Sequence, residues 1–251
     1  MKFSFVTLFP SLIEGYFSAS ILKRAVEAGL VEIECINPRD YSDDRYKKVD
    51  SPMIGGGAGM LMSPQPISDA IERLQEEENP VHTVFLSPAG KAFTQNDARR
   101  LATYSHIVLV SGRYEGIDER VIEMYADEVF STGDFVLTGG ELPALIVCDA
   151  VSRNIDGVLG NMDSLVEESF EDGLLESPAF TKPDDYKGSK IVSEFLKGNH
   201  SRIAAIKKLM ALYRTKYYRP DLYSIAKANH EKQIYREFRK NTDGEKGDTR
   251  I

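Results

Sequence analysis

The chain has 251 residues, of which 42% are apolar and 28% charged, and its formal net charge is −8. No stretch approaches the roughly 18 consecutive apolar residues of a membrane helix, so we expect no membrane partner and a cytoplasmic protein. The two cysteines, Cys35 and Cys148, lie far apart in apolar runs, which favours buried thiols over a disulfide or a metal site.

Strand-like and helix-like patterns alternate along the first 155 residues. Apolar, β-branched runs predict strands at residues 3–8, 31–36, 81–86, 107–110 and 128–131. Helical spacing of apolar residues predicts helices at residues 10–28, 64–78, 94–104, 117–125 and 141–155. Thr94 followed by Asp97 resembles a capping box with a shorter acid. The alternation predicts an α/β fold with a parallel sheet flanked by helices.

Longer segments without strong periodicity separate or follow these elements. Residues 37–62 are interpreted as a functional loop. Beyond Asn199 the pattern becomes helical again, which predicts a small all-α domain. We therefore expect a cofactor-binding domain at residues 1–160, a linker at 161–190 and a helical domain at 191–251.

Three glycine-bearing turns follow predicted strands, after Leu86, Val110 and Phe130. In an open parallel sheet, ligands bind at the carboxyl ends of the strands, where backbone without Cβ allows close approach. The three turns together predict a backbone-lined ligand pocket; tight packing of the turns is the alternative.

The glycine run at residues 55–60 is not a phosphate loop, because no Lys-Ser/Thr pair follows it and no buried strand precedes it. It is interpreted either as a flexible loop that closes over a substrate or as a bare turn.

Residues 181–220 form a basic block, in which ten Lys or Arg accompany three Asp or Glu. Tyr213, Tyr217 and Tyr218 are interleaved with these cations, a pattern typical of a surface for nucleic-acid phosphates and bases. A solvated helix face is an equally acceptable interpretation.

Several long motifs occur in a fixed order along the chain. They include Gly112-Arg113-Tyr114-Glu115-Gly116-Ile117-Asp118-Glu119-Arg120 and Gly133-Asp134-Phe135-Val136-Leu137-Thr138-Gly139-Gly140-Glu141-Leu142-Pro143-Ala144, with shorter runs at residues 55–60, 157–161, 173–176, 198–200 and 219–222. Over roughly residues 1–225 this set resembles the bacterial tRNA (guanine-N1)-methyltransferases of the SPOUT superfamily.

The resemblance implies a trefoil knot in the C-terminal half of the sheet and a homodimer with the active site at the subunit interface. It further implies S-adenosylmethionine as cofactor, the anticodon arm of tRNA as partner, and methylation of guanosine N1 at position 37. The implied cofactor-binding residues are Pro88, Gly90, Gly112, Tyr114, Glu115, Thr132, Gly133, Asp134, Phe135, Val136, Leu137, Gly139, Gly140 and Pro143. Glu115 is also the position that matches a contact to Mg²⁺.

Two residues match the family's catalytic pair. Glu168, in Glu167-Glu168-Ser169-Phe170, stands where the family has an aspartate base, and Arg153 matches the arginine near guanine O6. A carboxylate base and a cation are what removal of the N1 proton requires. Taken singly, Glu168 could be a solvated acid, and Arg153 a cation favoured by a helix C-terminus.

The remaining matches concern tRNA. They are Gly57, Gly59, Met60, Glu176, Lys182, Asn199, His200, Arg214 and Arg219. The chain departs from the family at Ala179 and Lys182, and it contains no tryptophan. Together with Glu168 these departures leave two alternatives: a diverged SPOUT paralogue that binds cofactor and RNA with weak or no turnover, or an enzyme that methylates another RNA site.

Overall fold

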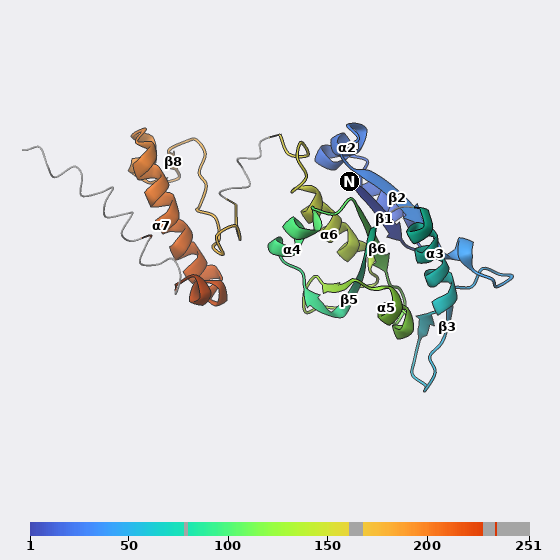
Figure 1. The fold of residues 1–251 in the computed structure, drawn as a ribbon. Helices are drawn as coiled ribbons and strands as arrows, with labels where there is room; N and C mark the ends of the chain where they lie inside the picture. The colour runs from blue at the N-terminus through green and yellow to red at the C-terminus, as the bar shows by residue number, and fades with distance from the viewer. Residues whose placement is uncertain (78–79, 161–167, 228–233, 235–251) are drawn as a thin grey trace, which may run out of the picture. The chain divides into compact units, whose positions relative to one another are not determined.

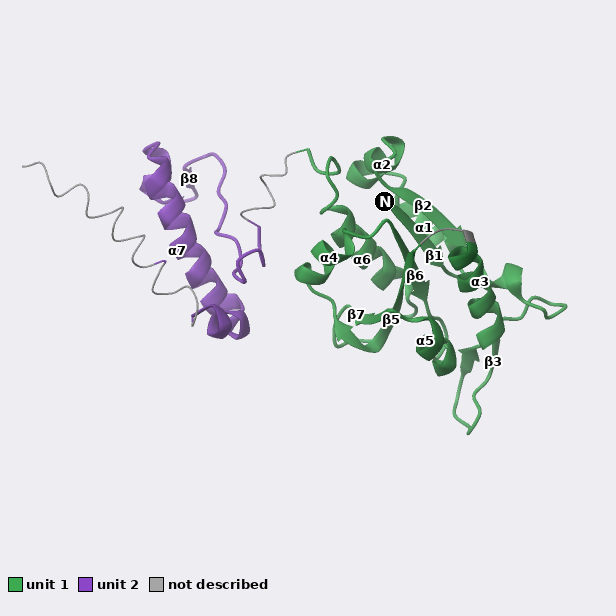
Figure 2. Cartoon of the chain, viewed as in Figure 1, with its two compact units in different colours: residues 1–160 green, residues 161–251 purple. Residues whose placement is uncertain are grey.

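The computed structural model describes residues 1–77, 80–160, 168–227 and 234. The chain divides into two compact units, residues 1–160 and 161–251 (Figure 2).

The first unit is built on a five-stranded sheet in the order β2-β1-β6-β5-β7. The strands are β1 (Lys2–Val6), β2 (Glu32–Ile36), β5 (Val81–Ala92), β6 (His106–Ser111) and β7 (Glu128–Ser131). All four neighbouring pairs run parallel. The predicted parallel α/β sheet is confirmed.

Helices cover both faces of this sheet (Figure 1). They are α1 (Pro10–Tyr16), α2 (Ser20–Glu27), α3 (Pro64–Glu77), α4 (Gln95–Leu101), α5 (Glu119–Tyr125) and α6 (Glu141–Ser152). Alternate strand residues enter two different cores: Phe5 and Leu109 pack with α1, α2, α4 and α6, while Val6 and Val110 pack with α3 and α5. Burial on both faces explains why these strands read as nearly continuous apolar runs.

Several boundaries differ from the prediction, and three of these differences are described here. The helix expected at residues 10–28 is two helices, because the chain turns after Phe17 and Ser20 adopts a positive φ of 62°. Strand β5 continues to Ala92, with its pairing to β7 interrupted between Leu86 and Lys91. Helix α5 begins only at Glu119.

The segment interpreted as a functional loop, residues 37–62, contains a short 3₁₀ helix, η1 (Pro38–Tyr41), and an antiparallel hairpin. Its strands are β3 (Asp50–Pro52) and β4 (Met60–Met62). Met62 also bridges to Ile117, which ties the hairpin to the segment before α5. The segment is therefore attached to the sheet domain at its C-terminal end.

The second unit contains the long helix α7 (His200–Tyr218), the hairpin β8 (Asp185–Tyr186) and β9 (Ser189–Lys190), and the 3₁₀ helix η3 (Ser193–Leu196). Residues 220–227 are also helical. Parts of the expected linker and helical domain, residues 161–167, 228–233 and 235–251, lie outside the described residues, so that division stays a prediction. Among the residues described, no helix is long and apolar enough to cross a membrane.

Candidate functional site

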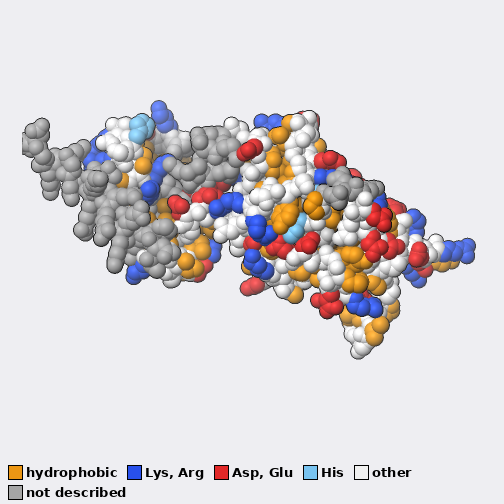
Figure 3. Space-filling view, in the orientation of Figure 1, with side chains coloured by type: hydrophobic (Ala, Val, Ile, Leu, Met, Phe, Trp, Pro, Cys, Tyr) orange, Lys and Arg blue, Asp and Glu red, His pale blue; other side chains and the backbone are white. Residues whose placement is uncertain are grey.

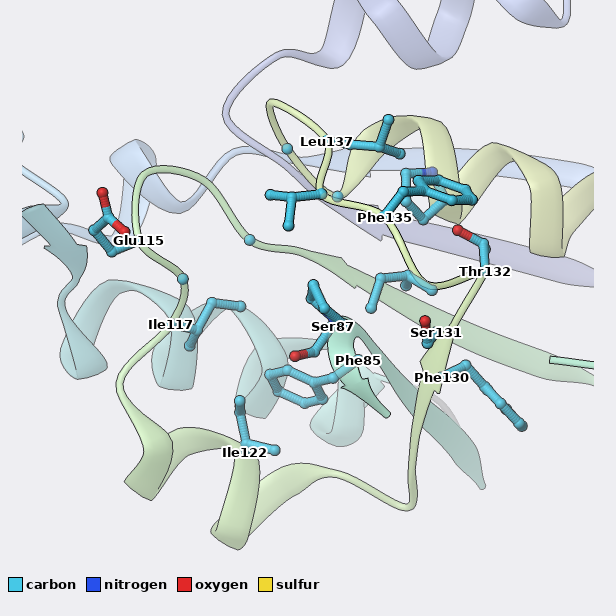
Figure 4. A pocket seen from close by; sticks show the side chains of 18 of the residues that line it. Phe85, Ser87, Glu115, Ile117, Ile122, Phe130, Ser131, Thr132, Phe135 and Leu137 are labelled. Atoms are coloured by element: carbon cyan, nitrogen blue, oxygen red, sulfur yellow. The ribbon is translucent and has the colours of Figure 1, made fainter. Parts of the chain in front are cut away.

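A cavity of about 280 Å³ lies at the carboxyl ends of β6 and β7 and beside residues 85–88 of β5, where the pairing of β5 with β7 is interrupted. Its walls come from residues 85–88, 112–122 and 130–143, which include the three glycine-bearing turns (Figure 4). The volume is close to the lower end of small-molecule sites, roughly 300 Å³. The turns therefore meet around one cavity.

Close backbone contacts shape this cavity. Gly140 donates its N–H to the carbonyl of Gly112 over 2.8 Å. A Cβ on Gly140 would lie 2.8 Å from the Gly112 nitrogen and from the Ser111 Cα, and one on Gly90 would lie 2.6 Å from the carbonyl carbon of Phe130. No side chain fits at either glycine without a backbone shift, because atoms of packed segments already fill the space.

Apolar side chains of the loop between β7 and α6 stand beside the cavity. Phe135, Val136 and Leu137 line it, yet each is exposed, Val136 most of all at 85%. Ser131 fixes the start of this loop, because its hydroxyl donates to the carbonyl of Gly133 over 3.0 Å. Exposed apolar groups at the mouth of a cavity are typical of a surface covered by a ligand or a partner.

A buried ion pair braces the other end of this loop. The Nε of Arg113 lies 2.8 Å from Oε2 of Glu141, whose side chain is only 3% exposed. Arg113 also donates to the carbonyl of Thr138 and covers the ring of Phe9, while the Thr7 hydroxyl donates to Glu141. Residues 138–141 are thus held in one conformation.

Glu115 joins the cavity to the glycine hairpin. Its N–H donates to the carbonyl of Met60 over 3.0 Å, and a Cβ on Gly59 would lie 2.6 Å from its carboxylate. Gly57 and Gly59 both have positive φ, which favours glycine. The glycine run, interpreted from the sequence either as a loop that closes over a substrate or as a bare turn, therefore lies against a cavity residue.

Two carboxylates, Glu115 and Glu119, line the cavity. No group of three or more His, Cys, Asp or Glu side chains that could hold a metal occurs in the part of the chain that the structure describes. Within the described residues, Glu115 and Glu119 could supply part of the ligands of Mg²⁺, an ion that usually keeps water or substrate ligands.

Most residues expected to bind the cofactor line this cavity. They are Pro88, Gly112, Tyr114, Glu115, Thr132, Gly133, Phe135, Val136, Leu137, Gly139, Gly140 and Pro143. Gly90 and Asp134 are not among the lining residues; Gly90 packs against the Phe130 backbone, and Asp134 is exposed.

Sequence reasoning missed several lining residues. They are Phe85, Leu86, Ser87, Gly116, Ile117, Glu119, Ile122, Phe130 and Ser131. The sequence feature that could have indicated them is their position, because most of them end a strand or adjoin a glycine turn. The brace formed by Arg113 and Glu141 was also missed, since its partners are distant in sequence.

The two expected catalytic residues belong to different units. Arg153 is the half-buried C-cap of α6 in the first unit. Glu168 is half-buried in the second unit, where its carbonyl accepts from the Glu171 N–H. Their proximity stays a prediction.

The residues expected to contact tRNA in the second unit have varied surroundings. Asn199 caps α7 by accepting from the N–H of Arg202, and His200 is the first residue of that helix. Arg219 pairs with Asp221 at 2.6 Å. Arg214 donates to main-chain carbonyls, whereas Lys182 and Glu176 are exposed.

Comparisons with known proteins all indicate the same family. Residues 1–225 match the family described as "tRNA (Guanine-1)-methyltransferase TrmD". A tRNA (guanine-N(1)-)-methyltransferase of Sulfurovum sp. is 62% identical over 223 residues, which cover 89% of this chain and 98% of the relative. The protein of the same name from Campylobacter curvus is 57% identical over 236 residues, covering 92% of this chain and all of the relative.

Proposed function

We infer, from the fact that this chain belongs to the tRNA (guanine-1)-methyltransferase family, that it transfers a methyl group from S-adenosylmethionine to guanosine N1 at tRNA position 37. The match of 225 consecutive residues to this family is the observation that carries the inference. The cavity at the carboxyl ends of the strands supplies a fitting place for the cofactor.

The cavity suits S-adenosylmethionine because glycine turns, apolar side chains and carboxylates all line it. Main-chain N–H and C=O groups of these turns that do not bond to one another could pair with adenine, and the carboxylate of Glu115 or Glu119 could accompany a cationic sulfonium. When bound, the cofactor supplies an electrophilic methyl group. The protein's part is to hold it and to exclude water.

We propose that the segments around this cavity form the trefoil knot of the SPOUT superfamily. The contact between Gly140 and Gly112 supports this proposal, because threading needs chain segments that can pass closely. True knots are rare, so such a topology would be a distinctive feature of the fold.

In the proposed chemistry, Glu168 would accept the N1 proton of guanine while the N1 electron pair forms the new bond to the methyl carbon. The bond from that carbon to the cofactor sulfur would break, and its electron pair would stay on the sulfur of the thioether product. Arg153 stabilises the negative charge that develops on O6. Both assignments rest on the matching positions of the family motif, with glutamate in place of aspartate.

We propose a homodimer, which an exposed apolar surface of the first unit supports. Phe9, Leu12, Tyr16, Leu142 and Ile146 on and beside α1 and α6 are each at least 42% exposed. Helices α1 and α6 contact each other, so these side chains belong to one surface, called here the α1–α6 face. Exposed apolar patches of this kind mark protein interfaces. We propose that two copies pair through it and that each Glu168 serves the partner's cavity.

The metal and the tRNA would use the remaining matched residues. Mg²⁺ would contact Glu115, with other ligands from substrate and water. The second unit would hold the anticodon arm through its Lys and Arg side chains, several of which are visible on its surface in Figure 3.

The direct test is methyl transfer by the purified full chain. With labelled S-adenosylmethionine and a tRNA carrying guanosine at positions 36 and 37, we expect one methyl group on N1 of guanosine 37. Glu168→Gln should lower kcat by about 10²–10⁴-fold, the usual contribution of a general base. Methylation at another nucleotide, or none, contradicts the proposal.

The Glu168→Asp variant separates a working enzyme from a diverged paralogue. Similar turnover by wild type and variant indicates a working enzyme. A rise from no turnover to rapid methylation indicates that the natural chain has lost activity.

A further inference from the structure

The segment that carries Glu168 is a closed turn. The Phe170 N–H donates to the carbonyl of Leu174 over 2.7 Å, and the Glu176 N–H donates to the hydroxyl of Ser169 over 3.1 Å. Positive φ angles at Phe170 and Gly173 reverse the chain between these bonds. Because Ser169 is next to Glu168, the position of Glu168 depends on where this turn is anchored.

One side chain of α7 anchors the turn. Thr215 is completely buried, and its hydroxyl accepts from the Leu175 N–H over 2.9 Å. The same hydroxyl donates to the carbonyl of Ala211 over 2.7 Å. Its single proton is therefore engaged within the helix, and a lone pair faces Leu175.

Arg214 provides a second link from α7 to the same segment. Its Nη1 lies 3.4 Å from the carbonyl of Glu176 and 3.3 Å from that of Ser177. Two neighbouring residues of one helix thus hold three consecutive residues of the turn.

We propose that Thr215 is a positioning residue for the methyl-transfer reaction, acting through the turn that bears Glu168. The proposal rests on the proposed function, in which Glu168 is the base. A carboxylate misplaced by about 1 Å can cost about 10² in rate, so an anchor that sets this turn controls kcat. The anchor also holds the turn with Glu168 against α7. A tRNA bound by α7 would therefore have a fixed position relative to Glu168.

The test compares Thr215→Val, which keeps the shape and removes the hydroxyl, with Thr215→Ser, which restores it. We expect Thr215→Val to lower kcat by at least about tenfold with the tRNA KM changed less than about threefold, and Thr215→Ser to recover most of the kcat. Hydrogen exchange should accelerate at residues 168–177 while α7 stays protected. Thr215→Ala gives the same comparison if valine prevents folding.

Thr103→Val is the control for loss of a threonine hydroxyl away from this turn. The hydroxyl of Thr103, an exposed residue just past the end of α4, donates to the carbonyl of Arg100, as that of Thr215 donates to the carbonyl of Ala211. Removal of the Thr103 hydroxyl should leave kcat unchanged. A Thr215→Val enzyme with wild-type kcat, or one whose kcat loss serine does not rescue, overturns the proposal.

A double-mutant cycle with Glu168→Gln separates this inference from the proposed function. If Thr215 acts through Glu168, adding Thr215→Val to Glu168→Gln should lower kcat no further. A fully active Glu168→Gln would overturn the base assignment and the role of Thr215 with it. An inactive Glu168→Gln beside a wild-type Thr215→Val overturns the role of Thr215 alone.

Discussion

Gly140 is the residue whose identity the cavity constrains most directly. A methyl group there would lie 2.8 Å from the backbone of Ser111 and Gly112, so Gly140→Ala must push two packed segments apart. We expect a loss of about 1–3 kcal/mol in the free energy of unfolding, the usual effect of overpacking, and weaker binding of S-adenosylmethionine. Denaturant unfolding and titration calorimetry measure the two effects.

Gly160→Ala is the control for this substitution. No atom of the described residues lies within 4 Å of a Cβ at Gly160, and its φ is outside the positive range. The change should alter stability by less than about 0.5 kcal/mol. Equal effects at Gly140 and Gly160 would show that the close contact does not matter.

At the residue scale, the sequence predicted which residues lie at the cavity better than it predicted which side chains contact each other. Glycines after apolar strands pointed to the cavity, because glycine is needed wherever backbones approach closely. The pairing of Arg113 with Glu141 could not be predicted, since only the folded chain brings their side chains together. Arg214 was expected to contact tRNA, yet the structure also gives it main-chain partners that no motif indicates.

Helix α4 provides a prediction at the scale of one element. Thr94 and Asp97 form a reciprocal capping box, as the sequence suggested, and Lys91 pairs with Asp97 at 2.7 Å. Burial alone would raise the pKa of Asp97, but the hydrogen bonds from Lys91 and Thr94 outweigh it and hold the pKa below its usual value. The ionised form therefore stabilises the fold.

The sign of the pH effect follows from this lowered pKa. The stabilisation is fully present above the unfolded-state pKa of about 3.9 and is lost as pH falls through the lower folded-state value. Asp97→Asn should cost about 1 kcal/mol at neutral pH, and its difference from wild type should shrink below about pH 4. Urea unfolding at several pH values measures this; a difference that grows in acid contradicts it.

The order and type of most sheet-domain elements could be predicted because the period of apolar residues changes between strand and helix. The residues at which these elements begin and end could not be predicted. The break between α1 and α2 depends on a positive φ at Ser20, and a serine in the sequence does not indicate a positive φ. The extension of β5 past Pro88 depends on pairing with β7, a contact between distant segments.

For the whole molecule, the α1–α6 face predicts the oligomeric state. Replacing Leu12 and Ile146 together with glutamate would place charges on both helices of the proposed interface, where burial without partners is costly. We expect a monomer with little methyl-transfer activity, because each Glu168 is proposed to serve the partner's cavity. Analytical ultracentrifugation gives the mass.

Met124→Glu is the control for the charged double variant. Met124 is 62% exposed on α5, a helix that packs on the opposite side of the sheet from α1 and α6. The Met124→Glu variant should remain a dimer. A double variant that also stays dimeric would show that the interface lies elsewhere.

The close packing of Gly140 against Ser111 and Gly112 bears on how the protein would respond to an inhibitor that occupies the cavity. A bulkier residue at Gly140 would move this part of the cavity wall and so weaken the contacts of the inhibitor. The same shift would disturb the place proposed for the cofactor. We therefore expect a resistance substitution at Gly140 to lower methyl-transfer activity as well.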